Sequence, residues 1–331
     1  MKVLPGQVLL ALFSAASSFP AQAADPERNG TLSVVLENDL FYDVDRHYTN
    51  GVGFIWTPAR RTPTPAWAME VARHVPWFPK QGEVRHGYAF GQSMFTPSDI
   101  KVANPPLSER PYAGWLYGSI GLGVVSGRQL DVLYMSIGMV GPASLAEQSQ
   151  KFVHKVIGAD QPQGWDTQLH NEPGIVLTSR RSWHSLTASP STSTRLDLTP
   201  HIGAALGNVF TYANTGLTLR FGERLPDDFG PPRIQPGPPG GADFSLVSDF
   251  GWYLFAGIEA RLVARNIFLD GNTFRDSRSV DKIPLVGDLQ YGIVLDWPSI
   301  RLSYTHVLRS REYRTQSGRD DFGALSLSVK F

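Results

Sequence analysis

The last eight residues, "ALSLSVKF", alternate between apolar and small or polar side chains and end on an aromatic residue. Leu325, Leu327, Val329 and Phe331 share one face of such an extended chain. Side chains of a β-strand point alternately to its two faces, so this period of two predicts a strand with one apolar and one polar face. The pattern favours a sheet whose two faces meet different surroundings.

The same alternation recurs in segments 52–56, 217–221 and 258–262, where apolar residues alternate with glycine, hydroxyl or charged residues, and with Ile55 in the first segment. A secreted β-sandwich produces this pattern too, and it remains the alternative. Combined with an export signal and a terminal aromatic, the alternation favours a closed transmembrane barrel with lipid outside and a polar lumen. A terminal Phe on an alternating last strand also resembles the recognition signal of outer-membrane barrels.

The first residues are typical of a secretory signal peptide. Lys2 precedes an apolar run from Val8 to Phe13, and the small-x-small ending Ala21-Gln22-Ala23 follows. We therefore expect residues 1–23 to be a signal peptide and residues 24–331 to form one outer-membrane barrel domain. Beyond the signal peptide no run of 18 apolar residues occurs, so a membrane would be crossed by strands.

Twelve strands are predicted, an even number as bacterial barrels require. They begin near residues 31, 49, 86, 114, 129, 171, 193, 208, 252, 287, 300 and 322. The predicted fold class is thus all-β, a transmembrane antiparallel barrel of about 12 strands with one short helix in an outer loop.

Strand parity divides the connections between two ends. If both termini lie in the periplasm, the outer end receives segments 39–48, 96–113, 142–170, 264–283 and 312–321. Segments 59–85 and 223–250 then become periplasmic, although periplasmic turns are usually short. The first contains a candidate amphipathic helix, "PAWAMEVARHVPWF".

Composition excludes several kinds of chemistry. The 30 basic and 30 acidic residues balance, which gives no general reason to expect nucleic-acid binding. Cysteine is absent, so thiolate catalysis, zinc-thiolate sites and disulfides are impossible.

Three polar groups lie in the predicted outer segments. The first is "LENDLFYDVDRHYTNG", in which Asn38 and Asp39 end one strand and Thr49 opens the next. Carboxylate, amide and hydroxyl oxygens suit a hard cation such as Ca²⁺. A polar hairpin tip with Asp and Asn in turn positions is the alternative.

The second group, residues 93–118, holds Lys101 and Arg110 in the next outer loop. Cationic side chains at a barrel mouth fit recognition of phosphate groups. An ordinary solvated loop explains the same charges.

The third group is a helix over 144–158. Ser144 and Glu147 predict a capping box and Gly158 a stop. An apolar stripe that includes Phe152 and Val156 is expected to pack against the protein, with His154 beside it. A lone histidine on a helix is usually structural. If His154 is catalytic, a general base acting on water is the simplest scheme, because no G-x-S-x-G nucleophile motif occurs.

The chain resembles the LpxR family of outer-membrane lipid A 3′-O-deacylases. The resemblance rests on "LENDLF", "YTNGVGF", "FTPSDI", "ERPYAGWLYGS", "VGPASLAEQSQKFVHKVIG" with "PQGWDTQLHNEPG", and the last strand. These segments run in order from about residue 32 to the C-terminus.

The resemblance implies a Ca²⁺-dependent hydrolase that removes the 3′-linked acyloxyacyl group of lipid A in lipopolysaccharide. It assigns the active site to Asn38, Asp39, Thr49 and His154, with His154 activating a water molecule while calcium stabilises the oxyanion. Asp160, six positions after His154, corresponds to an acidic residue of the family. Asp39, Thr49 and Asp160 are therefore candidate metal ligands.

The family also implies a lysine that contacts a lipid A phosphate, and Lys101 is the nearest candidate, with Arg110 in the same loop. The alternatives are a non-enzymatic channel or structural barrel of the outer membrane, and an outer-membrane esterase that acts on phospholipid. We expect no nucleic-acid partner and a monomer.

Overall fold

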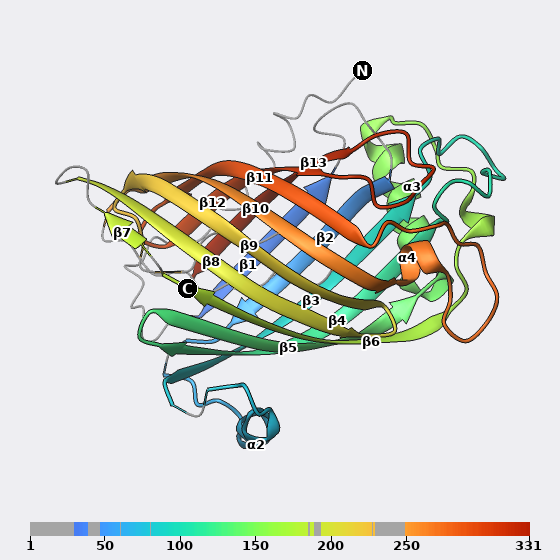
Figure 1. The fold of residues 1–331 in the computed structure, drawn as a ribbon. Coiled ribbons are helices and arrows are strands. Elements are labelled where there is room, and N and C mark those ends of the chain that lie inside the picture. Colours follow the sequence, from blue (N-terminus) through green and yellow to red (C-terminus); the bar gives the residue numbers. More distant parts are fainter. Residues whose placement is uncertain are drawn as a thin grey trace.

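The computed structural model describes residues 30–38, 47–59, 61–79, 81–184, 186–188, 193–226, 228 and 249–331. Asp39 and the predicted signal peptide lie outside the described residues, as do the side chains of residues 47–50. The described chain forms a single antiparallel sheet that curls into a barrel (Figure 1).

The strands are β1 (Thr31–Asn38), β2 (His47–Thr57), β3 (Glu83–Thr96), β4 (Ala113–Ser126), β5 (Gln129–Val140), β6 (Glu172–Trp183), β7 (Leu186–Ala188), β8 (Thr194–Gly207), β9 (Phe210–Glu223), β10 (Gly251–Asn266), β11 (Leu285–Asp296), β12 (Ile300–Arg309) and β13 (Asp320–Lys330). The helices are α2 (Ala66–His74), η2 (Pro142–Ser144), α3 (Ala146–Ile157), η3 (Trp165–Thr167) and α4 (Ile267–Asp270). Among the described residues, none of these helices has the length and apolarity that crossing a membrane requires.

The sheet closes because β1 pairs with β13 and β6 pairs with β8. The short β7 pairs with β8 alone, beside one end of the wall. Twelve strands therefore form the wall, and the predicted fold class is confirmed. Each predicted strand begins within a few residues of the observed one, and those beginning at Thr31, Gln129 and Ile300 match at the residue.

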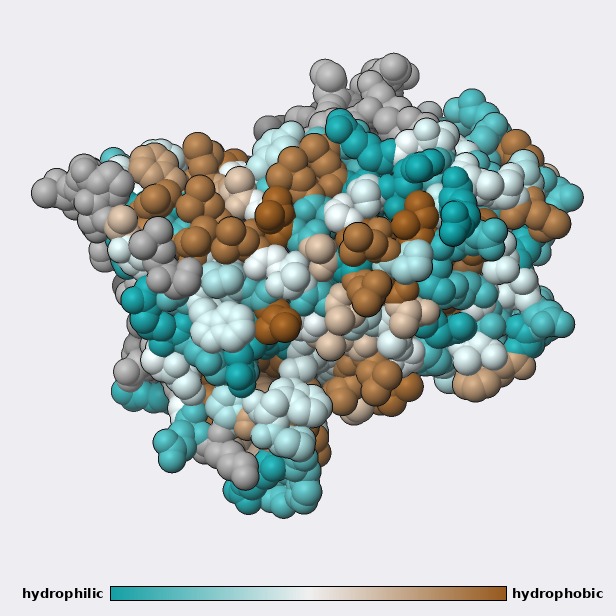
Figure 2. Space-filling view, viewed as in Figure 1, coloured by the Kyte–Doolittle hydropathy of each residue, from teal (hydrophilic) through white to brown (hydrophobic). Residues whose placement is uncertain are grey.

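The wall has an apolar exterior and a polar interior, as the period of two predicts. On β10, Ile258 and Leu262 are exposed, whereas Glu259 and Arg261 between them are buried. Figure 2 shows hydrophobic side chains gathered along the outside of the wall. Inside, Ser33 of β1 and Ser328 of β13 join their hydroxyl groups at 2.6 Å across the closing seam.

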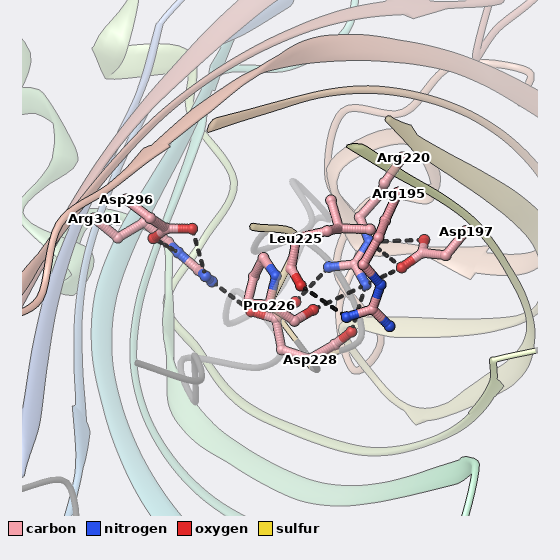
Figure 3. Close-up of polar contacts among 8 residues, drawn as sticks. All are labelled: Arg195, Asp197, Arg220, Leu225, Pro226, Asp228, Asp296 and Arg301. Carbon is pink, nitrogen blue, oxygen red and sulfur yellow. Dashed lines mark hydrogen bonds and ion pairs between the residues drawn. The ribbon is translucent and has the colours of Figure 1, made fainter. Parts of the chain in front are cut away.

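Ion pairs occupy the lumen at the end where the C-terminus lies (Figure 3). Arg220 contacts Asp197 and Asp228, and Arg301 contacts Asp228 at 2.8 Å and Asp296 at 2.5 Å. Asp228 follows β9, so the start of the predicted connection 223–250 enters the lumen and joins two arginines of the wall. Buried arginines placed between carboxylates keep their charges compensated.

A second ionic layer and an aromatic cluster lie farther along the lumen. Asp288 contacts both Arg261 and Arg309, and His201 lies 2.9 Å from Glu259. Nearer the opposite end the Phe95 and Phe268 rings stack at 4.0 Å, and further aromatic side chains surround them. The described side chains thus occupy the lumen with paired charges and rings.

The loops at the end of the barrel opposite Gly30 and Phe331 interlock into one cap. The Leu169 amide donates to the carbonyl of Tyr112, Arg278 donates to the carbonyl of Pro105, and the Ile283 amide donates to the carbonyl of Glu312. The predicted outer segments 96–113, 142–170, 264–283 and 312–321 therefore meet at one end, at the right of Figure 1. We call this the outer end, because the longer loops of such barrels face outward.

Candidate active site on the outer wall

Both ends of helix α3 are set by a residue in the left-handed backbone conformation. It starts after Leu145, which adopts a left-handed conformation with φ 60°, and Gly158 ends it at φ 72°. The predicted capping box was wrong, because Ser144 belongs to the preceding 3-10 turn and no side chain caps the helix. Glu147 instead forms an ion pair with Lys151, one turn later, at 2.6 Å.

Helix α3 lies against the outside of the barrel wall. On β4, Ala113 and Trp115 are buried within the barrel, so Gly114 between them faces outward. A Cβ atom at Gly114 would stand 2.2 Å from the Ala146 Cβ and from the Ser144 hydroxyl. Gln92 of β3 donates to the Ser144 carbonyl at 2.6 Å. The absent side chain at Gly114 therefore lets the start of α3 approach the wall.

The apolar stripe of α3 faces away from the protein. Leu145, Phe152 and Val156 are 52%, 67% and 64% exposed, whereas Ala146, Gln150 and His154 are buried. The prediction that the apolar stripe packs against the protein was wrong. The wall buries the small and polar face of α3, and the apolar face is left on the same side as the apolar outside of the barrel.

His154 is held in one orientation by the main chain. It is 2% exposed, and its Nδ1 lies 2.5 Å from the carbonyl oxygen of Asp160. A carbonyl oxygen can only accept, so Nδ1 carries the hydrogen and a neutral imidazole keeps Nε2 as its acceptor. The bend after Gly158 that returns Asp160 to the helix therefore selects the tautomer that a general base needs.

The carboxylate of Asp160 turns toward a different partner. It contacts Lys101 Nζ at 2.7 Å, and both side chains are about two-thirds exposed. The hydrogen bond that Lys101 donates to the Asp160 carboxylate raises the pKa of Lys101, so Lys101 is a stable cation beside the segment that follows helix α3. The predicted metal ligation by Asp160 stays a prediction, and so does the phosphate contact of Lys101.

The strand register connects Asn38 and Thr49 to the wall beneath α3. Asn38 ends β1 on its outward face and pairs with Asn50, which pairs with Met94 on β3. The pairing of β2 with β3 shifts between Tyr48 and Asn50, so Thr49 is the extra residue of a β-bulge. Met94 packs with Ala146 in the cluster under α3. Bulges commonly re-aim backbone beside active sites.

Arg110 lies inside the barrel mouth, away from the outer side of α3. It is 1% exposed, its Nη1 stands 3.4 Å from Glu312 Oε2, and its guanidinium lies 5.0 Å from the Phe95 ring centroid. Its Nε and Nη2 have no hydrogen-bond partner among the described residues. The predicted substrate contact of Arg110 stays a prediction, and the observed contacts join two outer loops.

The described residues bring Asn38, the Thr49 backbone, Lys101 and His154 to the outer end of the same stretch of wall, β1 to β4 with α3 on it. No group of three or more metal-ligating side chains occurs among the described residues, and Asp39 lies outside them. Gly114 was not predicted as part of the site, although a glycine inside a strand can signal that another part of the backbone approaches closely.

Comparison with known proteins assigns the family. The model of the family described as outer membrane protein LpxR matches residues 8–331. The chain belongs to the LpxR family. It is a β-barrel of the outer membrane. Comparison with curated protein sequences gave no significant match.

Solved structures agree with the fold of this LpxR-family chain. LpxR from Salmonella typhimurium aligns with a TM-score of 0.75 and 17% identity, over 91% of this chain and 100% of that chain. The β domain of the Bordetella autotransporter BrkA aligns with a TM-score of 0.46 and 7% identity, over 92% and 99% of the two chains. The first match supports the twelve-stranded barrel.

Proposed function

We propose that this protein is a Ca²⁺-dependent lipid A 3′-O-deacylase that hydrolyses the 3′-linked acyloxyacyl ester. Its membership of the LpxR family supports an outer-membrane lipid A deacylase. The observation that carries the proposal is the setting of His154, a buried and oriented imidazole on the wall-facing side of helix α3, whose opposite face is apolar and exposed. Such a helix holds a base against the barrel wall and turns a face that suits the acyl chains of a membrane lipid away from it.

His154 acts as the general base in this proposal. Nε2 removes a proton from a water molecule, and the resulting hydroxide adds to the ester carbonyl carbon. The bond between the carbonyl carbon and the sugar oxygen then breaks, and the imidazolium gives its proton to that oxygen, which leaves as a hydroxyl, so the histidine ends the reaction neutral. The Asp160 carbonyl accepts from Nδ1 throughout and stabilises the imidazolium, as an oriented acceptor does for a catalytic histidine.

Oxygen donors near the end of β1 fit a calcium ion. Asn38, Asp39 and Thr49 offer amide, carboxylate and hydroxyl oxygens, which are the ligands that Ca²⁺ prefers. The β-bulge at Thr49 supports this assignment, because it frees that residue from regular pairing with β3 at the level of Met94 and α3. When bound, calcium would supply positive charge to the developing oxyanion.

Substrate would approach from the membrane side. The exposed Leu145, Phe152 and Val156 continue the apolar outer wall to the level of His154, so they suit contact with acyl chains. Lys101 is cationic and exposed at the same end, where a lipid A phosphate would lie. Asp160 keeps this lysine in place until a phosphate competes for it.

The lumen favours an enzyme over a channel. Arg220, Arg301 and Asp228 form a buried ionic network across the periplasmic half of the barrel. Side chains that cross the lumen in this way oppose the water-filled path of a porin. A phospholipid esterase uses the same catalytic chemistry, and substrate competition distinguishes the two enzymes.

The test is mass spectrometry of lipid A from cells that express the wild-type protein or His154→Gln. Wild-type protein should remove the 3′-linked acyloxyacyl group, and the variant should leave lipid A intact while its barrel remains heat-modifiable on gels. Chelation of calcium should stop the wild-type reaction reversibly. Unchanged lipid A with folded wild-type protein, in membranes and in detergent, would refute the proposal, and preferential release of phospholipid acyl chains would replace it with the esterase.

A further inference from the structure

The segment between β2 and β3 lies on the outside of the barrel wall near the periplasmic end. Helix α2 packs through Ala68 and Ala72 onto Leu122 and Val124 of β4. These two residues share the outward face of β4 with Gly114, opposite Trp115. Figure 1 shows α2 outside the outline of the barrel, below β5. The helix thus covers wall surface of the kind that faces lipid elsewhere.

The segment 61–79 crosses four strands, and we call it the collar. Thr64 contacts His86 of β3 at 3.5 Å, and Phe78 packs in the same cluster as Leu133 of β5. The Trp77 indole donates to Ser179 of β6 at 2.9 Å. The collar is therefore fixed to β3, β4, β5 and β6 by its own side chains.

The collar covers an ion pair on the outward face. Asp131 of β5 and Arg181 of β6 stand opposite each other in register, with Arg181 Nε 2.6 Å from Asp131 Oδ1. Arg181 also donates to the Trp77 carbonyl at 3.0 Å. Charged side chains on the lipid face of a barrel destabilise it at the bilayer centre and are tolerated near the interfaces. The pair therefore marks the level at which acyl chains give way to headgroups.

The exposed apolar and charged side chains of helix α2 in the collar lie on different sides of the helix. Trp67 and Val71 lie about 40° apart around α2 at 100° per residue, and both are exposed, as is Trp77. Glu70 and Arg73 pair at 2.9 Å on another side of the helix, with Arg73 about 160° from Val71. Helix α2 is seen nearly end-on in Figure 1 while the strands run across it, so its axis crosses the barrel axis.

We propose that the collar is a membrane-interface anchor that binds the phospholipid leaflet on the periplasmic side of the outer membrane. A helix lying along the membrane plane, with tryptophans at the headgroup level, has the form of an interfacial anchor. We identify lipid as the bound partner because the collar adjoins a surface of the wall that faces lipid. The exposed Ile137, Ile175 and Leu177 of that surface lie on β5 and β6, two of the strands that the collar crosses. The collar extends that lipid-facing surface sideways.

The absence of cysteine makes a direct test clean. Single variants Val71→Cys, Arg73→Cys and Ile137→Cys carry a nitroxide label in the full-length protein, reconstituted in vesicles of phosphatidylethanolamine and phosphatidylglycerol. Collision of each label with oxygen, which concentrates in lipid, is compared with collision with a water-soluble nickel chelate. Ile137 provides the lipid reference and Arg73 the matched position on the other side of α2.

The label at Val71 should resemble that at Ile137, with its oxygen-to-nickel collision ratio several times that at Arg73. A nickel-dominated signal at Val71 equal to that at Arg73 would overturn the proposal and leave a soluble protein partner as the occupant. Heat-modifiable migration of each labelled variant confirms that the barrel is folded. The outcome is independent of whether the protein deacylates lipid A.

Discussion

Nδ1 of His154 lies 2.5 Å from the main-chain oxygen of Asp160, while the carboxylate of the same aspartate lies 2.7 Å from Lys101. Asp160 therefore acts on the histidine through its backbone and on the lysine through its side chain. This separation allows the two roles to be tested by one substitution.

Asp160→Asn should keep most of the deacylase activity at saturating calcium, because the carbonyl that orients His154 remains. The calcium concentration that gives half-maximal activity should also be unchanged if the carboxylate is not a metal ligand. Activity measured against calcium concentration decides this. An increase of tenfold or more in the calcium requirement would return Asp160 to the metal site.

The same variant should lower the pKa of Lys101, because the hydrogen bond that Lys101 donates to the Asp160 carboxylate raises that pKa above its ordinary value in the wild type. A raised lysine pKa gives a contribution to stability that is fully present below the unfolded-state pKa and is lost as pH rises through the folded-state value. NMR titration of reductively methylated lysines, with Lys101→Arg to assign the signal, measures the shift. An unchanged Lys101 midpoint in Asp160→Asn would contradict the pairing.

Gly114→Ala should reduce activity at least tenfold with the barrel intact, because its Cβ would overlap Ala146 and Ser144 and displace α3 from the wall. Gly118→Ala is the matched control on the same outward face of β4, where the nearest atom to a Cβ is 4.0 Å away. Deacylation assays in detergent, with heat-modifiability as the folding check, compare the two. Equal activity of both variants would mean that α3 needs no close contact at Gly114.

The strands of the wall, and the end of the barrel at which each connection lies, could be predicted from sequence. This is because the residues of each strand alternate between its two faces. Residues 258–262 alternate in sequence, and the structure exposes Ile258 while burying Glu259. The orientation of α3 could not be predicted in this way. Its apolar stripe was expected to pack against the protein, whereas the structure exposes it. An apolar helical face indicates burial in something nonpolar, and a barrel offers lipid as well as protein for that purpose.

The site was predictable only in part for a related reason. Motifs identified His154, but its hydrogen bond to the Asp160 carbonyl depends on how the chain bends after Gly158. The bulge at Thr49 depends on the register between two strands, which a single strand's sequence does not contain. The enclosure of Arg110 depends on Glu312, which lies 202 residues away along the chain.

Phe152→Ser combined with Val156→Ser should weaken activity toward lipid A in bilayers while largely sparing it toward substrate in detergent micelles. Both side chains are exposed on the face of α3 opposite His154, so their loss removes contact with acyl chains rather than packing within the protein. Lys155→Ser, at an exposed polar position of the same turn, is the control. A loss of activity that is equal in micelles and bilayers would indicate a structural role for the stripe.

Asp228→Ala should destabilise the barrel by on the order of 2 kcal/mol or more, because it leaves two buried arginines, Arg220 and Arg301, each short of one carboxylate. Asp249→Ala removes an exposed ion pair with Arg224, separated by 3.7 Å, and should cost at most about 1 kcal/mol. Urea unfolding in phospholipid vesicles, followed by heat-modifiability, measures both. If the two variants unfold at the same urea concentration, Asp228 does not hold the lumen network together, and the argument against a channel loses its main support.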